Sequence, residues 1–169
     1  IAALNFTQNA HYRPREDNKE KISYFELIPW LLYQCATVAE AKARLERLNI
    51  THTPFSKDLP VSELHWLVAD REQSITVEAV EEGIKIYDNP TGILTNNPPF
   101  PQQMFYLNNY MSLSAKTPKN TFAKQLALKT YSRGMGALGL PGDLSSSSRF
   151  VRAVFTKSNS SSPKTENDN

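Results

Sequence analysis

The sequence predicts an α+β fold in which pairs of helices pack on an antiparallel sheet. Three observations support this prediction. Apolar residues recur with helical spacing between residues 24 and 48, and they alternate with polar residues between 64 and 95. The connections between the alternating segments are only a few residues long. Such connections are too short for the crossovers that parallel strands require.

Two capping boxes predict consecutive helices near the start of the chain. In a capping box, a Ser or Thr and a Glu three residues later satisfy free backbone N–H groups at a helix start. The two boxes are Ser23 with Glu26 and Thr37 with Glu40. They predict helices from about 24 to 35 and from about 37 to 48. Pro29 lies too deep for the first turn, so we expect a kink or a late start there.

Strands are predicted on both sides of a loop that is bounded by prolines. The first four residues resemble the end of a buried strand, whereas residues 10–22 and 50–63 have the composition of loops. Segments with a period of two then follow, separated by turn residues. These predicted strands are residues 64–69, 75–80, 84–87 and 93–95. We expect them to form an antiparallel meander.

The second half of the chain contains more loop than regular structure. We expect helices at residues 100–109 and 148–157, separated by a loop-rich stretch. Residues 1–157 are interpreted as the central part of a single domain. Residues 158–169 are polar and nearly free of apolar side chains, which predicts a flexible tail.

Composition argues against several classes of protein. The 169 residues are 40% hydrophobic and 21% charged, with a net charge of +2, as in an ordinary globular domain. The basic residues are scattered, so a nucleic-acid partner is not expected. No apolar run has the length of a membrane span, and the first residues lack a secretory pattern. The single cysteine, Cys35, favours a reducing compartment and predicts a cytoplasmic protein.

Three possible sites of chemistry are better explained by structural roles. Gly134, Gly136 and Gly139 match a dinucleotide-binding motif by spacing, but the strand, helix and acidic residue that this motif needs are missing. Cys35 lies in an apolar helical segment, which is typical of an inert buried thiol. The histidines show no metal-ligand spacing, so no metal site is expected. His65 is interpreted as a structural residue on a strand.

Two polar residues have both a structural and a functional interpretation. Asn96 ends a predicted strand just before a stretch of prolines, where it is either a turn residue or an amide donor for an oxyanion. Arg149 lies at a predicted helix start, which is an unfavourable place for a cation. It is either a surface residue or one that is compensated by an anionic group. The local sequence leaves both alternatives open.

The loop between the helices and the sheet carries two large apolar residues, Phe55 and Leu59. They could contact a hydrophobic ligand, or they could simply cover the core. The local sequence leaves these two alternatives open as well.

Eight short motifs occur in a characteristic order. They are Leu4-Asn5-Phe6, Phe25-Glu26-Leu27-Ile28-Pro29-Trp30, Leu64-His65-Trp66-Leu67-Val68-Ala69-Asp70, Tyr87-Asp88-Asn89-Pro90, Leu94-Thr95-Asn96-Asn97-Pro98, Leu107-Asn108-Asn109-Tyr110, Tyr131-Ser132-Arg133-Gly134-Met135-Gly136 and the stretch from Leu140 to Phe150. In this order they resemble the choloylglycine hydrolase family, which contains conjugated bile salt hydrolases and penicillin V acylases. The chain resembles especially the bile salt hydrolases of Gram-positive gut bacteria.

This resemblance implies an N-terminal-nucleophile hydrolase with an αββα sandwich. In such an enzyme the thiol of an N-terminal cysteine attacks an amide carbonyl, and the α-amino group of that cysteine serves as the base. The resemblance implies that Asn96 is the side-chain oxyanion donor and that the backbone N–H of Asn5 completes the hole. It places Arg149 beside the nucleophile. Asn5 also favours a bile salt hydrolase, because penicillin V acylases tend to carry Tyr there.

The resemblance also implies a substrate and a binding site. Phe55, Leu59 and Leu64 match apolar positions around a steroid pocket, and the substrate would be a glycine- or taurine-conjugated bile acid. No cofactor or metal is implied, and the family tends to form homotetramers. The alternatives are a penicillin V acylase and a non-catalytic module that binds bile acids.

The chain departs from the family pattern at its start. It begins with Ile1 instead of the nucleophilic cysteine, so the resemblance covers a central fragment that we expect to be inactive alone. Cys35 cannot replace the nucleophile, because an internal residue has no free α-amine to act as the base.

Overall fold

The computed structural model describes residues 1–14 and 18–160. The chain divides into two compact units, Ile1–Gln103 and Met104–Asn169, and each is described by itself. The prediction of a single domain over residues 1–157 stays a prediction.

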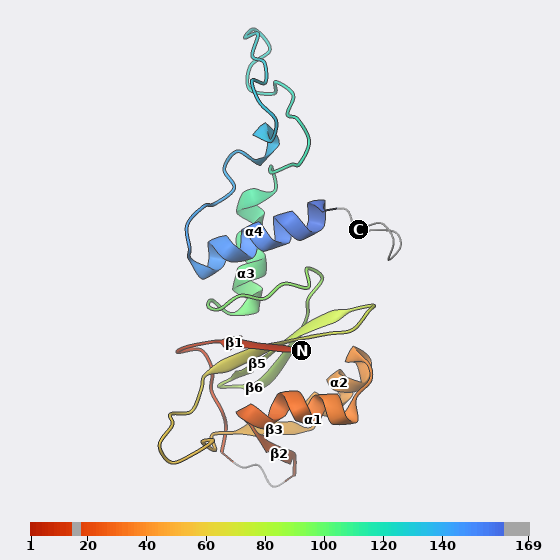
Figure 1. Cartoon of the computed structure of the whole chain (residues 1–169), viewed down its shortest axis with the longest axis vertical. Coiled ribbons are helices and arrows are strands. Elements are labelled where there is room, and N and C mark those ends of the chain that lie inside the picture. Colours follow the sequence, from red (N-terminus) through yellow and green to blue (C-terminus); the bar gives the residue numbers. More distant parts are fainter. Residues whose placement is uncertain (15–17, 161–169) are drawn as a thin grey trace. The chain divides into compact units, whose positions relative to one another are not determined.

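The first unit is built on a four-stranded antiparallel sheet (Figure 1). Its strands lie in the order β1-β4-β5-β6. They are β1 (Ala2–Asn5), β4 (Leu64–Ala69), β5 (Ser74–Val80) and β6 (Gly83–Asp88). The meander predicted from residue 64 to 87 is thereby confirmed. The expected strand at the start of the chain is also present, but the expectation that it is buried is wrong, because three of its four residues are exposed. That first strand pairs with β4 and extends the sheet by one strand.

Two helices follow one another as the capping boxes predict. A short 3-10 helix at Tyr24–Glu26 leads into α1 (Leu27–Gln34), and α2 (Val38–Leu45) comes next. The late start expected near Pro29 is therefore confirmed. Thr37 and Glu40 form the second box, in which Glu40 N donates to Thr37 Oγ1 at 3.2 Å and Thr37 N donates to Glu40 Oε2 at 3.3 Å.

The structure contains a small parallel sheet that the sequence pattern does not predict. It consists of β2 (Glu20–Ser23) and β3 (Leu48–Thr51). The expected loops at 10–22 and 50–63 are therefore wrong at these residues, and the second helix ends three residues before Leu48. The α1–α2 pair forms the crossover that two parallel strands require. Each strand has only four residues, so neither leaves a clear period in the sequence.

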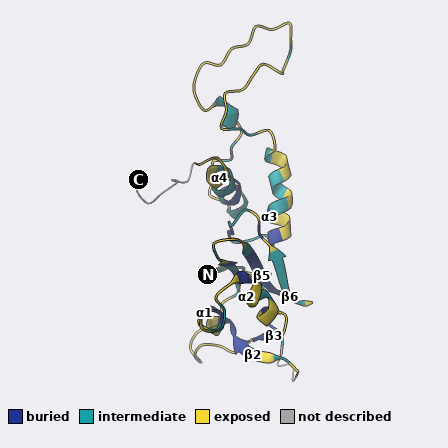
Figure 2. Cartoon of the chain, turned by 90° about the vertical axis from the view of Figure 1, so that its right-hand side faces the viewer, coloured by how far each residue is buried: buried dark blue, intermediate teal, exposed yellow. Residues whose placement is uncertain are grey.

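The two faces of the four-stranded sheet have different character. Trp66 and Val68 of β4 and alternate residues of β5 face α1, α2 and the small sheet, with which they form the apolar core. His65, Thr76 and Glu78 alternate with these residues and are also completely buried. In Figure 2, β5 is accordingly coloured as buried along most of its length. The second face is therefore a buried polar surface.

The segment expected to be a strand at 93–95 is not one. Its backbone groups bond to side chains instead of to a neighbouring strand. Asn89 Nδ2 donates to Ile93 O at 2.8 Å, and His65 Nε2 lies 2.7 Å from Thr95 O. Apolar alternation could not show that side chains would replace a pairing strand here.

The second unit consists mainly of one long loop between helices. The helix α3 (Phe100–Tyr106) begins in the first unit and is followed by a 3-10 turn at Leu107–Tyr110. Residues 111–145 contain only the short 3-10 turn Met135–Ala137. The last helix, α4, spans Ser146–Asn159. The predicted helices at 100–109 and 148–157 are confirmed, with α4 longer at both ends.

The polar segment 158–169 falls only partly within the structure. Ser158 and Asn159 belong to α4 instead of to a tail, and residues 161–169 lie outside the described residues. Among the residues that the structure describes, no helix combines the length and apolarity needed to cross a bilayer.

Candidate active site

Asn5 and Asn96, which are far apart in the sequence, lie side by side in the first unit. The side-chain Nδ2 of Asn96 donates a hydrogen bond to the backbone carbonyl of Asn5 at 3.0 Å. Asn5 ends β1, and Asn96 lies on the segment that follows β6. The structure therefore brings together the two residues that the resemblance assigned to an oxyanion hole.

The backbone N–H and C=O groups of Asn5 point away from the neighbouring strand β4. Phe6 N donates to Glu63 O at 2.8 Å, and bonded and non-bonded pairs alternate along an antiparallel ladder. The preceding pair, Asn5 with Leu64, is therefore a non-hydrogen-bonded pair. The N–H and C=O of Asn5 thus both point to the outer side of β1, where no described strand follows. The Asn5 N–H and the Asn96 amide are consequently neighbours on this edge.

Three buried polar side chains form hydrogen-bonded contacts with the backbone at Asn96 or with one another. They are Gln103, His65 and Glu78. Gln103 Nε2 donates to Asn96 O at 2.7 Å, and His65 Nε2 lies 2.7 Å from the carbonyl of the preceding residue. His65 Nδ1 in turn lies 3.2 Å from Glu78 Oε1. All three side chains are fully buried. They occupy the polar face of the sheet and the first turns of α3.

The sequence predicts only part of this arrangement. His65 is predicted to be structural, and in the structure its ring is buried and stacks on Phe6 with 4.4 Å between ring centroids. Glu78 and Gln103 were missed. One signal was present, because Thr76 and Glu78 interrupt an otherwise apolar strand. That pattern normally indicates a solvated face, and only the fold shows that the face is covered.

Arg149 lies in the second unit, at the fourth position of α4. Its Nε donates to Leu144 O at 3.2 Å. The carboxylate of Asp143 lies at this helix start and accepts from Ser145 N at 2.9 Å and from Ser148 Oγ at 2.6 Å. These bonds lower the pKa of Asp143 to about 2. Compensation of Arg149 by an anionic group stays a prediction. That Arg149 lies beside a nucleophile stays a prediction.

Two serines at the start of α4 have structural roles. Ser145 is the N-cap, and its side chain accepts from Ser148 N at 3.3 Å. Ser148 is buried and directs its hydroxyl to Asp143. This local network fixes the start of the helix that carries Arg149.

The three residues expected at a steroid pocket differ in their exposure. Phe55 and Leu59 are 66% and 55% exposed on the loop before β4, and the Phe55 ring packs edge-on against Phe25 at 5.2 Å. Leu64 is half-buried in β4 and packs against the apolar core. Phe55 and Leu59 therefore do not cover the core, which leaves a ligand-contacting role for them as a prediction.

The remaining candidates have no catalytic arrangement in the structure. Burial raises the pKa of the Cys35 thiol, and the nearby Glu40 adds to this effect, so the thiol is a poor nucleophile. Gly134 and Gly139 have φ angles of 79° and 94°, which confirms their role as turn residues. The residues that the structure describes contain no cluster of His, Cys, Asp or Glu suited to a metal ion.

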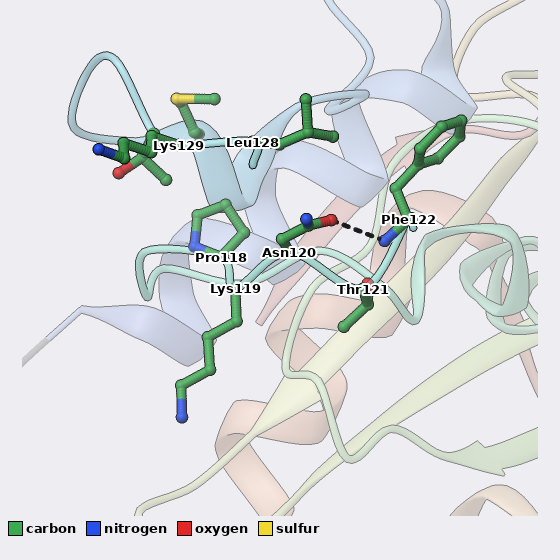
Figure 3. A pocket seen from close by; sticks show the side chains of 9 residues that line it. Pro118, Lys119, Asn120, Thr121, Phe122, Leu128 and Lys129 are labelled. Carbon is green, nitrogen blue, oxygen red and sulfur yellow. Dashed lines mark hydrogen bonds between the residues drawn. The ribbon is translucent and has the colours of Figure 1, made fainter. Parts of the chain in front are cut away.

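One pocket of about 210 Å³ lies entirely within the long loop of the second unit. Figure 3 shows Pro118, Asn120, Phe122 and Leu128 among its lining residues, with the Asn120 side chain directed to the backbone nitrogen of Phe122 at 3.1 Å. None of the six predicted site residues lines this pocket, so we do not connect it with the candidate site.

Curated proteins with similar sequences are enzymes named for bile salts. The chain is 58% identical over 166 residues to the bile salt hydrolase/transferase of Lactiplantibacillus plantarum, an alignment that covers 98% of this chain and 51% of that protein. It is 33% identical over 158 residues to the bile salt hydrolase/transferase of Clostridium perfringens, covering 92% and 48%. The chain thus spans about half the length of these relatives.

Solved structures show the same relationship. The chain matches a crystal structure of an alanine mutant of the conjugated bile acid hydrolase from Clostridium perfringens with a TM-score of 0.86 and 33% identity, covering 93% of this chain and 48% of that one. An arginine-to-leucine variant of the same hydrolase gives a TM-score of 0.84 and 34% identity, with the same coverage. This likeness confirms the predicted α+β class and agrees with part of an N-terminal-nucleophile hydrolase fold.

The family itself is matched along the whole sequence. Residues 1–169 match the linear amide C–N hydrolases of the choloylglycine hydrolase family. Sequence, fold and the juxtaposed asparagines agree, and the chain belongs to the choloylglycine hydrolase family.

Proposed function

We propose that the full-length protein containing this chain is an amidohydrolase that releases glycine or taurine from conjugated bile acids. The observation that carries this proposal is the contact of 3.0 Å between Asn96 Nδ2 and Asn5 O. This contact places a side-chain amide next to an outward-pointing backbone N–H. Membership of the family and the names of the similar proteins support the substrate.

The proposed reaction starts at an N-terminal cysteine that lies outside this chain. The α-amino group of that cysteine takes the thiol proton, and the sulfur attacks the amide carbonyl of the substrate. Negative charge then develops on the carbonyl oxygen, where donors fixed in advance stabilise it most effectively. The Asn96 amide and the Asn5 N–H are those donors. Glycine or taurine leaves with a proton, and water hydrolyses the thioester that remains.

The other predicted site residues have roles away from the oxyanion. A guanidinium group near the cysteine would favour the thiolate, and this is the role proposed for Arg149. Phe55 and Leu59 would contact the steroid. Their exposure of 66% and 55% supports this role, because exposed apolar side chains on a loop are available to a hydrophobic ligand. Leu64 would line the same pocket from β4.

The assembly and the compartment are further parts of the proposal. We infer a homotetramer from the family resemblance, and a cytoplasmic location from the single cysteine. Light scattering on the purified full-length protein tests the first inference. A monomeric mass at micromolar concentration would contradict it.

Hydrolysis by the full-length protein tests the proposed function. We expect glycocholate and taurocholate to be cleaved much faster than penicillin V, and we expect the mature protein to begin with cysteine when its intact mass is measured. A variant with serine at that first position serves as the control and should be inactive. Preferred cleavage of penicillin V would replace the proposal by the acylase alternative. Binding of bile acid without turnover would indicate a non-catalytic module.

The printed names of the relatives add one readout to this test. Because they include a transferase, the assay should be repeated with an added amino acid, and conjugated products should be sought by mass spectrometry. Free bile acid as the main product supports hydrolysis as the principal reaction.

A further inference from the structure

We propose that Gln103 is a positioning residue that sets the direction of the Asn96 amide in the oxyanion hole. This inference rests on the proposed function, and it gives a role to a residue that the mechanism does not otherwise use. Gln103 contacts neither the substrate nor the cysteine in this proposal. It acts through the backbone from which Asn96 projects.

The Gln103 side chain binds the segment on both sides of the Asn96 side chain. Its Nε2 donates to Asn96 O and to Pro98 O, at 2.7 Å in both cases. Carbonyl oxygens only accept, so the NH₂ end of the amide must face them. The Oε1 end accepts from Thr95 Oγ1 at 3.1 Å. Both N–H groups and the oxygen of this amide are thus used on residues 95–98.

The carbonyl before Asn96 is held from a second element. His65 Nε2 lies 2.7 Å from Thr95 O, and this nitrogen must carry the hydrogen because the carbonyl only accepts. The ring is fixed in turn by Glu78 Oε1 at 3.2 Å and by stacking on Phe6. Glu78 Oε1 also accepts from Phe100 N at 2.8 Å. That last bond anchors the start of α3, the helix that carries Gln103.

Two independent anchors therefore define the direction of the Asn96 amide. The Gln103 amide fixes the backbone at residues 96 and 98, and Asn5 O accepts from the tip of the Asn96 side chain. A donor is effective only when it points at the developing oxyanion before the reaction starts. A displacement of about 1 Å can cost roughly 100-fold in rate. Loss of the Gln103 bonds should therefore slow turnover without removing any group that contacts the substrate.

The first test is Gln103→Met in the full-length protein, with glycocholate as the substrate. Methionine has a similar length but cannot donate to the two carbonyls. We expect kcat to fall roughly 10- to 100-fold, with little change in KM, because the oxyanion forms only in the transition state. Gln102→Met is the matched control. Gln102 is the exposed neighbour on the same helix, and its replacement should leave both constants unchanged.

A double-mutant cycle separates positioning from a general structural role. If Gln103 acts through Asn96, then Gln103→Met should change kcat by less than about twofold in an Asn96→Ala background. If the two losses multiply, the inference is wrong. Thr95→Val provides a second route, because it removes the hydroxyl that holds Gln103 Oε1. This variant replaces Gln103→Met in the cycle if Gln103→Met does not fold. Its effect on kcat should likewise nearly disappear in the Asn96→Ala background.

A structural readout keeps this inference distinct from the proposed function. Crystal structures of the parent protein and of Gln103→Met should differ in the direction of the Asn96 amide. An unchanged amide would overturn the inference even if turnover fell. If the parent protein does not cleave glycocholate at all, the proposed function fails, and the position of the Asn96 amide in the two structures still decides the role of Gln103.

Discussion

Two loops of this chain lack both α-helix and β-strand but are ordered by different means. The first, residues 89–99, leads from β6 to α3 and carries Asn96. The second, residues 111–145, leads to α4 and ends just before Arg149. The first is fixed by buried polar side chains, whereas the second is held mostly by contacts between residues close in sequence.

Asn89 shows how the first loop is fixed. Its side chain is 2% exposed and donates to Thr76 Oγ1 at 3.0 Å and to Ile93 O at 2.8 Å. Its oxygen accepts from Thr91 N and Gly92 N at 3.1 and 3.0 Å. One asparagine thus ties the loop to β5 and closes its first turn. His65 and Gln103 provide the same kind of bond further along.

Asn120 has a similar number of bonds in the second loop, but all are local. It donates to Ala123 O and Leu126 O and accepts from Phe122 N and Ala123 N. The loop also exposes many large apolar side chains, which are Met111, Phe122, Leu126, Leu128, Tyr131, Leu138 and Leu144. Water can replace bonds made at such an exposed position, so they contribute little to stability.

The comparison suggests a relation between order and chemistry. The first loop, which carries the proposed oxyanion donor, is anchored to rigid elements, namely β4, β5 and α3. The bonds of Asn120 in the second loop are local, although the last residues of that loop orient the helix that carries Arg149. Four predictions test this difference, beginning with the largest expected effect.

The first prediction contrasts asparagines of the two loops in catalysis. Asn96→Ala in the full-length protein should raise the activation barrier for glycocholate hydrolysis by about 3 kcal/mol, because one oxyanion donor is lost. Asn120→Ala should leave kcat unchanged. Steady-state kinetics of both variants provide the measurement. Unchanged turnover in Asn96→Ala would exclude its role as a donor.

The second prediction concerns stability. Asn89→Ala leaves buried donors and acceptors without partners, so it should lower the free energy of unfolding by roughly 2–3 kcal/mol. Asn120→Ala should cost less than about 0.5 kcal/mol, because water reaches that site. Urea unfolding midpoints of the two variants give both values. If the two losses are equal, the distinction between the loops does not hold.

The sequence predicted the elements whose local pattern is strong. The period of two from Leu64 to Tyr87 and the capping boxes at Ser23 and Thr37 gave the meander and the helix starts nearly to the residue. The short parallel strands β2 and β3 were missed, because four residues are too few to establish a period. Each residue of β2 also pairs with a residue 28 positions further along the chain. Tertiary pairing, not local propensity, determines such strands.

The candidate site was predictable only through the family resemblance. Local sequence could not choose between a turn residue and a donor at Asn96. The structure adds the contact with Asn5, and the donor role stays a proposal. The roles of Glu78 and Gln103 depend on a covered sheet face, which no local pattern reveals. Buried polar residues that support a site are thus the part of a fold least visible in one sequence.

The third prediction concerns a close backbone approach at Gly136 in the second loop. A Cβ at Gly136 would lie 2.2 Å from Lys116 O and 2.4 Å from Ser114 O. Gly136→Ala must therefore push these two segments of the loop apart. We expect a loss of roughly 1–3 kcal/mol, at the lower end because the loop is exposed and can shift. The matched control is Gly142→Ala, where nothing lies within 4 Å. Equal unfolding midpoints for the two variants would show that this approach does not order the loop.

The fourth and smallest effect is expected at the end of the second loop, where Asp143 joins it to α4. Bonds from Ser145 and Ser148 lower the pKa of this carboxyl from 3.8 to about 2. A carboxyl whose pKa is lower in the folded state stabilises the protein at pH values above its unfolded-state pKa. This contribution is lost as the pH falls through the folded-state pKa. Between about pH 3.8 and about pH 2, the free energy of unfolding should therefore fall less in Asp143→Asn than in the parent protein. The measurement is urea unfolding at several pH values, with the exposed Asp58→Asn as the control. If Asp143→Asn and its control show the same dependence on pH, the carboxylate does not hold the loop to the helix.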